Sequence, residues 1–408
     1  MRLAEAGRLG MASLRLGARP RLSRGNELRL LRDGEAFFPA LISAIGEARR
    51  WVHLETYIFA DDNIGTRVAE ALAEAAARGV RTELVLDGFG CGEFGERLRT
   101  ELQALGVLVR IYRPARWWRL GRRQMRRLHR KIAVIDDEVA FVGGINIIDD
   151  FNHPGAERGT VGARFDYAVE VRGPLVAEVA LTARRLWWLL AVGRPGGEAA
   201  SLPPWAGAVP RPRPGGVLAG LLLRDNFRHR RTIEQAYLSA IGGARREVLI
   251  ACAYFVPGRR FRAALCAAAR RGVRVSLLLQ GRVDHSTWFH AQQALIGQLL
   301  EAGVAIHLYL PSYLHAKVAV VDEDWATVGS SNIDPYSLLL AREANVLVLD
   351  VGFAQALAGQ MRQVMTEEAR RVDASGHARR PWWVRATDWL AYGFVRFATR
   401  LLARGDLR

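Results

Sequence analysis

The sequence predicts an α/β fold built from two similar halves, and three observations support this prediction. Segments whose apolar residues are spaced three and four apart alternate with short apolar segments typical of strands. Short sequences recur at a nearly constant offset, as in the pairs Ala44–Arg50 with Ala240–Arg246 and Ala76–Arg81 with Ala269–Arg274. A histidine–lysine motif also occurs twice. A single long offset indicates duplication of one α/β unit, because a solenoid repeats at a far shorter period.

The sequence of the first half predicts alternating helices and strands. Apolar spacing predicts a helix over 37–50, and alternation predicts a strand over 51–59. An Ala-rich helix over 66–78 ends at Gly79, and a short apolar strand follows over 80–86. The second half repeats this order.

Composition predicts where the domains begin and end. Six of the 15 prolines fall in one Gly-rich stretch, which is typical of a linker. The predicted units are a basic tail (1–25), the first half (26–192), the linker (193–216), the second half (217–370) and a basic Trp-rich segment (371–408).

The last segment predicts an amphipathic helix over 381–402, in which Trp, Phe and Leu alternate with Arg. Such a helix suits the interface of a bilayer, although packing on the protein core is the alternative. The first half also has eleven extra residues before its motif. They form a basic, aromatic loop, either solvated or able to bind a charged surface.

Charge and cysteine content restrict the class of protein. The net charge of +17 predicts attraction to polyanions, either nucleic acid or an anionic membrane surface. No apolar run is long enough to predict a spanning helix, so any membrane contact is expected to be peripheral. The three cysteines show no CxxC spacing, which favours a reducing compartment over a disulfide framework.

The repeated motif has the form His-x-Lys-x4-Asp. It places its histidine, lysine and aspartate at His129, Lys131 and Asp136 in one half, and at His315, Lys317 and Asp322 in the other. Small residues and an Asn follow each copy, namely Gly144 with Asn146 and Ser330 with Asn332, and all four are expected to bind phosphate. Among 58 basic residues these two lysines are the only ones. A compact ammonium is therefore needed at both places, as suits one oxygen of a small anion.

Two such units face to face would combine two imidazoles, two ammoniums and two amides. This donor-rich set suits a phosphate whose charge grows in the transition state. One histidine could attack phosphorus while the other protonates the leaving oxygen. Metal ligation is the alternative for a histidine pair, but two neighbouring ammoniums would repel a divalent cation.

A nucleophilic imidazole needs its second nitrogen anchored, usually by a carboxylate. Glu343 begins an apolar strand of the second half and is the predicted partner of His315. Asp166 precedes the corresponding strand of the first half and is the predicted partner of His129. The motif aspartates are counted with the catalytic set, but their position at strand ends favours a structural role as turn acceptors or arginine partners.

From about residue 28 to 365, the doubled motif resembles the phospholipase D superfamily. The run Leu314–Pro335, with Leu338–Asn345, resembles the bacterial cardiolipin synthases, most closely the B type. The resemblance implies two α/β/α halves about a pseudo-two-fold axis, no metal or other cofactor, and a phosphohistidine intermediate. It implies that both histidines are catalytic, and that Lys131, Lys317 and the two asparagines bind phosphate. The first half departs from the usual Gly-Ser pair by having Gly143-Gly144.

The expected reaction is transfer of a phosphatidyl group between two phosphatidylglycerol molecules, with release of glycerol. A phospholipase D that uses water or another alcohol is the alternative, and a nucleic-acid phosphodiesterase is a further one. The expected partners are phosphatidylglycerol, other anionic phospholipids and the membrane surface, without nucleic acid. The expected location is the cytoplasmic side of the inner membrane, as a peripheral protein.

Overall fold

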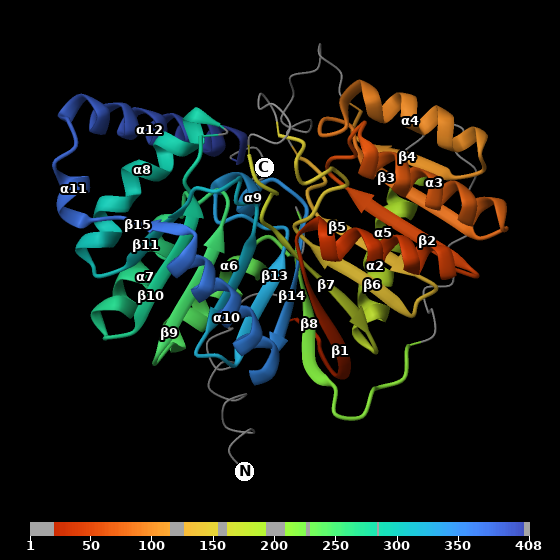
Figure 1. Cartoon of the computed structure of the whole chain (residues 1–408), viewed down its shortest axis with the longest axis horizontal. Helices are drawn as coiled ribbons and strands as arrows, with labels where there is room; N and C mark the ends of the chain where they lie inside the picture. Colours follow the sequence, from red (N-terminus) through yellow and green to blue (C-terminus); the bar gives the residue numbers. More distant parts are fainter. Residues whose placement is uncertain are drawn as a thin grey trace.

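The computed structural model describes residues 20–114, 126–153, 161–192, 209–225, 229–283 and 285–403, with side chains to residue 399. These residues form one 15-stranded sheet in the order β15-β11-β10-β9-β12-β13-β14-β8-β1-β7-β6-β5-β2-β3-β4. Each half contributes one end of the sheet, and the halves join where β1 and β8 pair antiparallel (Figure 1). The duplication predicted from the repeats is therefore confirmed.

The first half follows the expected alternation of strands and helices. Its elements are β1 (Leu22–Arg32), α2 (Asp33–Glu47), β2 (Trp51–Thr56), α3 (Asn63–Ala77), β3 (Arg81–Asp87), α4 (Gly92–Ala104), β4 (Leu108–Tyr112), β5 (Lys131–Ile135), β6 (Val139–Gly143), β7 (Tyr167–Arg172) and α5 (Leu175–Val192). Local signals fix the ends of α3: the Asp62 side chain accepts the N–H of Gly65, and Gly79 takes the positive φ of +85° after the helix.

The second half repeats the plan and adds elements at its end. Its elements are β8 (Val217–Arg224), α6 (Thr232–Gly243), β9 (Glu247–Cys252), α7 (Arg259–Arg270), β10 (Arg274–Gln280), α8 (Ser286–Glu301), β11 (Ala305–Tyr309), β12 (Lys317–Val321), β13 (Trp325–Gly329), α9 (Pro335–Leu339), β14 (Glu343–Leu349), α10 (Val351–Glu367), β15 (Ala369–Arg371), α11 (Ala374–Ala378) and α12 (Trp382–Ala403).

Strand direction determines where the motifs lie. In each half three strands are parallel, β2-β3-β4 and β9-β10-β11, and the motif strand pairs antiparallel with the first of them. The beginning of a motif strand therefore lies at the carboxyl edge of the parallel strands, the edge where α/β proteins bind ligands.

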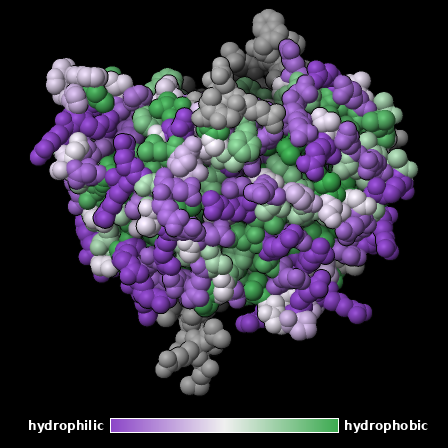
Figure 2. Space-filling view, in the orientation of Figure 1, coloured by the Kyte–Doolittle hydropathy of each residue, from purple (hydrophilic) through white to green (hydrophobic). Residues whose placement is uncertain are grey.

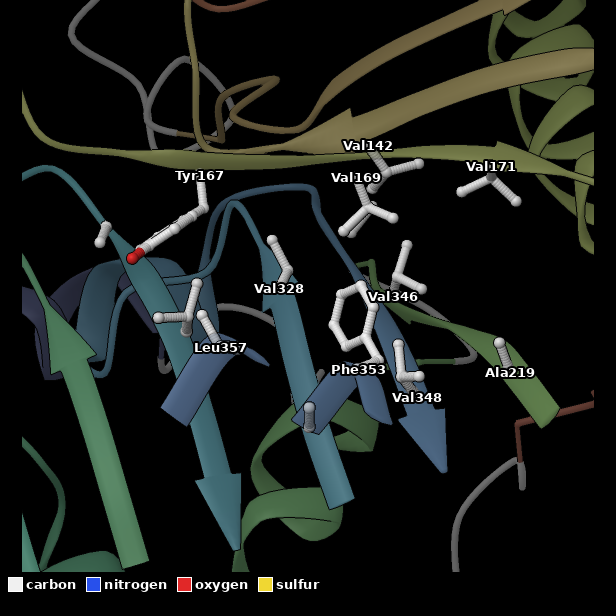
Figure 3. Close-up of a cluster of buried hydrophobic side chains, with 14 of the residues drawn as sticks. Val142, Tyr167, Val169, Val171, Ala219, Val328, Val346, Val348, Phe353 and Leu357 are labelled. Atoms are coloured by element: carbon white, nitrogen blue, oxygen red, sulfur yellow. The ribbon is translucent and has the colours of Figure 1, made fainter. Parts of the chain in front are cut away.

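Three hydrophobic clusters stabilise this arrangement. One lies under α2, α3 and α4, and an equivalent one lies under α6, α7 and α8. The largest joins the halves, because side chains of β5, β6 and β7 pack with those of β12, β13, β14 and α10. Figure 3 shows Val142 and Val169 of the first half facing Val328, Val346 and Phe353 of the second. The two halves therefore form one packed body.

The observed bounds differ slightly from those predicted. β1 begins at Leu22, inside the predicted tail, because this strand pairs with both β7 and β8. The rest of the tail, most of the linker and most of the extra loop (115–125) lie outside the described residues. The predicted terminal helix is present as α12, and no helix of the described chain is long and apolar enough to cross a bilayer. Hydrophilic side chains predominate on the face in Figure 2.

Candidate active site

Two crossed backbone bridges bring the motifs together. Leu128 bridges Arg342, and Leu314 bridges Phe165, each time with a residue of the other half. The His129 N–H donates to the Arg342 carbonyl at 3.0 Å, and the His315 N–H donates to the Phe165 carbonyl at 2.7 Å. Each histidine is therefore positioned by the backbone of the opposite half.

The carboxylate partners are crossed in the same way. His129 Nδ1 lies 3.0 and 3.1 Å from the Glu343 carboxylate oxygens, and His315 Nδ1 lies 2.6 Å from Asp166 Oδ2. The two carboxylates were predicted correctly as histidine partners, but the assignment within each half was wrong. The physical reason is that Glu343 and Asp166 directly follow the bridging residues, so each carboxylate points across the boundary between the halves.

The environment favours neutral imidazoles. Burial lowers the pKa of His129, and the Lys131 ammonium lowers it further against the opposing effect of Glu343. Burial lowers the pKa of His315 well below its usual value, and Lys317, Lys131 and Arg164 act in the same direction. A carboxylate at Nδ1 holds the proton there and leaves Nε2 as an acceptor or nucleophile.

The two lysines are buried at the same centre. Lys131 Nζ donates to the His129 carbonyl at 2.6 Å, and Lys317 Nζ donates to the His315 carbonyl. Lys317 Nζ also lies 3.8 Å from Asp166 Oδ2. Burial lowers the pKa of both ammoniums, that of Lys131 to about 7. The short reach to a carbonyl two residues away suits lysine and not the wide guanidinium of arginine.

The two asparagines occupy equivalent places beside the motifs. Asn146 Oδ1 accepts the Ile58 N–H at 3.1 Å, and Asn332 Oδ1 accepts the Tyr254 N–H at 3.4 Å. With the oxygen facing the backbone, each amide presents its NH2 as the group available to a ligand.

Ser330 and Gly144, both expected to bind phosphate, lie against the carboxylates of Glu343 and Asp166. The Ser330 hydroxyl is fully buried and donates to Glu343 Oε2 at 2.5 Å, so it orients the carboxylate. A Cβ on Gly144 would lie 2.4 Å from Asp166 Oδ1. Aspartate has a shorter side chain than glutamate, so the carboxylate of Asp166 lies closer to its own strand than the carboxylate of Glu343 does. A side chain at position 144 would therefore clash with Asp166.

Asp136 and Asp322, which were counted with the catalytic set, accept backbone N–H groups, as expected of a turn acceptor at a strand end. Asp136 accepts the backbone N–H groups of Arg49, Arg50 and Trp51 at 2.8 Å. Asp322 accepts the three equivalent N–H groups at 2.8 to 2.9 Å. Each aspartate follows a five-residue strand that begins at the lysine, which places it roughly 16 Å away at the opposite edge of the sheet.

Sequence reasoning missed three residues that shape the site. The Tyr57 ring packs on the His129 ring at 5.1 Å and lies under Lys131 Nζ at 5.5 Å. Asp87 accepts the N–H of the residue before His129, and Gln280 accepts the N–H of the residue before His315, both at 2.8 Å. Their signal in the sequence is position, since both end a parallel strand at the ligand-binding edge.

Two duplicated halves, each of which supplies one histidine of the pair, define a phospholipase D-like (PLD-like) protein. The chain belongs to the cardiolipin synthase family, because the family model "Cardiolipin synthase, PLD-like domain" matches residues 41–152 and 237–365. Cardiolipin synthase B of Escherichia coli (strain K12) is 39% identical over 383 residues, which cover 91% of this chain and 88% of the relative. Cardiolipin synthase 2 of Bacillus cereus is 32% identical over 368 residues, 90% of this chain and 70% of the relative.

Solved structures agree on the fold. Phosphatidylserine synthase of Haemophilus influenzae superposes with a TM-score of 0.69 at 13% identity, over 98% of both chains. Polyphosphate kinase of Porphyromonas gingivalis gives 0.58 at 14% identity, over 86% of this chain and 49% of that one. Within the described residues, no group of three or more His, Cys, Asp or Glu side chains is arranged to hold a metal ion.

Proposed function

We propose that the protein makes cardiolipin by transferring a phosphatidyl group from one phosphatidylglycerol to another. One observation carries the proposal: His129 and His315 each hold a buried carboxylate at Nδ1, beside two buried lysines. This is the arrangement that a two-step displacement at phosphorus requires, with one nucleophile and one proton donor.

In the first step, Nε2 of one histidine attacks the phosphorus of the donor lipid. An N–P bond forms, and the bond from phosphorus to the glycerol oxygen breaks. The other histidine, protonated, gives its proton to that oxygen, so glycerol leaves neutral. An anionic phosphodiester bound between the imidazoles favours the protonated form needed at the start.

In the second step, the histidine that lost its proton takes one from a hydroxyl of the acceptor lipid. The resulting oxygen attacks phosphorus, the N–P bond breaks, and the free imidazole is restored. The two ammoniums and the two asparagine NH2 groups stabilise the charge that develops on the phosphoryl oxygens. Because Lys131 and Lys317 are fixed before the substrate binds, little reorganisation opposes this stabilisation.

The α12 helix supports action on a membrane surface. Polar contacts attach it to α8. Asp388 of α12 is 1% exposed and accepts a hydrogen bond from His290 of α8 at 2.8 Å and another from Arg380 at 2.5 Å. Its opposite face carries large exposed side chains, namely Trp382, Trp383, Trp389, Leu390, Phe394 and Phe397. The helix also contacts α9, which begins three residues after Asn332 (Figure 1). Such a face inserts into the interface of a bilayer, and the charge of +17 favours anionic lipids. The proposed location is the cytoplasmic face of the inner membrane.

Product analysis tests the proposal. Purified protein is mixed with vesicles of phosphatidylglycerol and phosphatidylethanolamine, and the lipids are followed by mass spectrometry. Cardiolipin as the main product supports the proposal. Phosphatidate as the main product identifies a hydrolase instead. Absence of any lipid product, with cleavage of a nucleic-acid phosphodiester, would exclude lipid chemistry.

A further inference from the structure

Three arginines lie beside His129, and the equivalent positions beside His315 hold no arginine. They are Arg113, Arg127 and Arg342, and none forms an ion pair with a carboxylate of the described residues. By the repeat, the equivalent positions hold Leu310, Tyr313 and Phe165. The arginines on the His315 side are different ones: Arg164, whose charge is opposed by Asp150 and Asp166, and Arg282, which donates to the Leu310 carbonyl at 3.1 Å.

The three guanidinium groups are close together. Those of Arg113 and Arg342 lie 5.4 and 5.9 Å from the centroid of the Tyr112 ring. The Arg127 guanidinium donates to the Arg113 backbone carbonyl at 3.4 Å, and the Arg342 backbone N–H donates to the Arg127 backbone carbonyl at 2.8 Å. Burial lowers the pKa of Arg113, and the charges of Arg126, Arg342 and Arg127 lower it further. Such mutual repulsion favours an anion between them.

Ordinary surface solvation does not explain these side chains. Arg127 is only 7% exposed, and Nη1 of Arg113 is buried without a hydrogen-bond partner. The nearby Asp87 carboxylate already accepts the N–H groups of Leu128, Phe89 and Gly90. Arg127 lies over the Phe89 ring at 4.8 Å, and Arg113 and Arg342 lie over the Tyr112 ring. These ring contacts do not use up the N–H donors, which stay available to a ligand. Asp87 attracts the Arg127 charge, but one carboxylate does not balance three neighbouring guanidinium groups. Placing cations where water is partly excluded is costly, so the excess positive charge indicates an anionic ligand.

The cluster is connected to the reacting centre. Arg127 is two residues before His129, and Arg342 directly precedes Glu343, the carboxylate partner of His129. The Tyr57 ring packs on His129, and the Arg127 charge acts on the Tyr57 hydroxyl. A molecule that contacts the cluster therefore has its next atoms near the histidine pair.

We propose that Arg113, Arg127 and Arg342 form a second phosphate subsite, which binds the phosphodiester of the acceptor lipid while the donor phosphodiester reacts at the histidines. The inference rests on the proposed function and deepens it. An acceptor phosphatidylglycerol carries its hydroxyl on the glycerol attached to its own phosphate. Holding that phosphate beside His129 presents the hydroxyl to the phosphohistidine. Guanidinium groups suit a phosphodiester, whose two free oxygens match their paired N–H donors. The subsite would thus select a phosphate-bearing acceptor over water or a simple alcohol.

A partition experiment tests the subsite. The same phosphatidyl-enzyme is offered phosphatidylglycerol and ethanol, and the ratio of cardiolipin to phosphatidylethanol is measured. The double variant R113Q/R342Q alters the two less buried members, and R67Q/R270Q removes the same charge from exposed positions elsewhere. We expect the ratio to fall about tenfold or more in the first variant, the loss of one charge-assisted hydrogen bond, while phosphatidylethanol formation persists. The control should keep the wild-type ratio, and R342K should retain part of it.

Inorganic phosphate identifies the ligand of the subsite. It should lower the wild-type ratio by competition and have no effect on the ratio of R113Q/R342Q. If the variant loses sensitivity to phosphate but keeps the wild-type ratio, the arginines bind free phosphate and not the acceptor, which overturns the proposal. An unchanged ratio together with unchanged phosphate sensitivity also overturns it. If the wild-type protein makes no cardiolipin at all, the proposed function fails instead.

Discussion

Replacing Glu343 by Gln tests the crossed pairing of carboxylates and histidines. Glu343 is fully buried and accepts from His129 at 3.0 and 3.1 Å and from Ser330 at 2.5 Å. Glutamine keeps the shape but removes the charge that stabilises the imidazolium of His129. It can also donate to Nδ1, which would move the ring proton to Nε2. A hydrogen bond to a charged group contributes about 1.5–3 kcal/mol, so kcat should fall roughly 10- to 150-fold.

The assay combines rates with spectroscopy. Initial rates of cardiolipin formation give kcat, and NMR of protein labelled with 15N-histidine reports each imidazole. The E343Q variant should lower the pKa of His129 and change the resonances of that ring, with little effect on His315. The D166N variant is the matched control and should affect His315 instead. A perturbation of His315 alone by E343Q, or a kcat within about twofold of wild type, would refute the crossed pairing.

Three further predictions follow from the same geometry. Burial raises the pKa of Asp166 to about 6 and lowers that of Lys131 to about 7. We therefore expect kcat/KM to fall below pH 6, where Asp166 is protonated, and above pH 7, where Lys131 loses its charge. A flat profile of kcat/KM from pH 5 to 9 would contradict this. Gly144→Ser should lower the free energy of unfolding in urea by about 1–3 kcal/mol, because the new Cβ would lie against Asp166. Adding D166E should restore part of the loss, since the double variant reproduces the Ser–Glu pair of the other half. The double variant Trp382→Ala/Trp389→Ala should weaken binding to phosphatidylglycerol vesicles at least tenfold in co-sedimentation, while α12 stays folded. The reason is that each exposed aromatic side chain contributes about 1.5–3 kcal/mol when the membrane buries it. Unchanged binding would assign membrane contact to another surface.

The duplicated plan and the members of the site could be predicted from the sequence because each has a local signature. His129, Lys131 and Asn146 recur with the same spacing in the second half, and spacing along the chain needs no knowledge of tertiary structure. Asp166 and Glu343 could be chosen because each precedes an apolar strand.

The assignment of each carboxylate to a histidine could not be predicted, because it depends on how the halves pack. Repeats describe one half at a time, whereas the bridges Leu128–Arg342 and Leu314–Phe165 join different halves. The place of Asp136 could be predicted, because the motif spacing puts it at the end of the strand that begins at Lys131. The role of Gly144, by contrast, depends on a close contact with Asp166 that only the packed sheet creates.

The most direct test of the account measures cardiolipin and glycerol together. Purified protein acting on phosphatidylglycerol should release one glycerol for each cardiolipin formed, since each transfer expels one glycerol and retains the acceptor. H129A and H315A should each abolish both products, because the two halves supply a single site. Glycerol release matched by phosphatidate, or substantial cardiolipin synthesis by either single variant, would contradict the account.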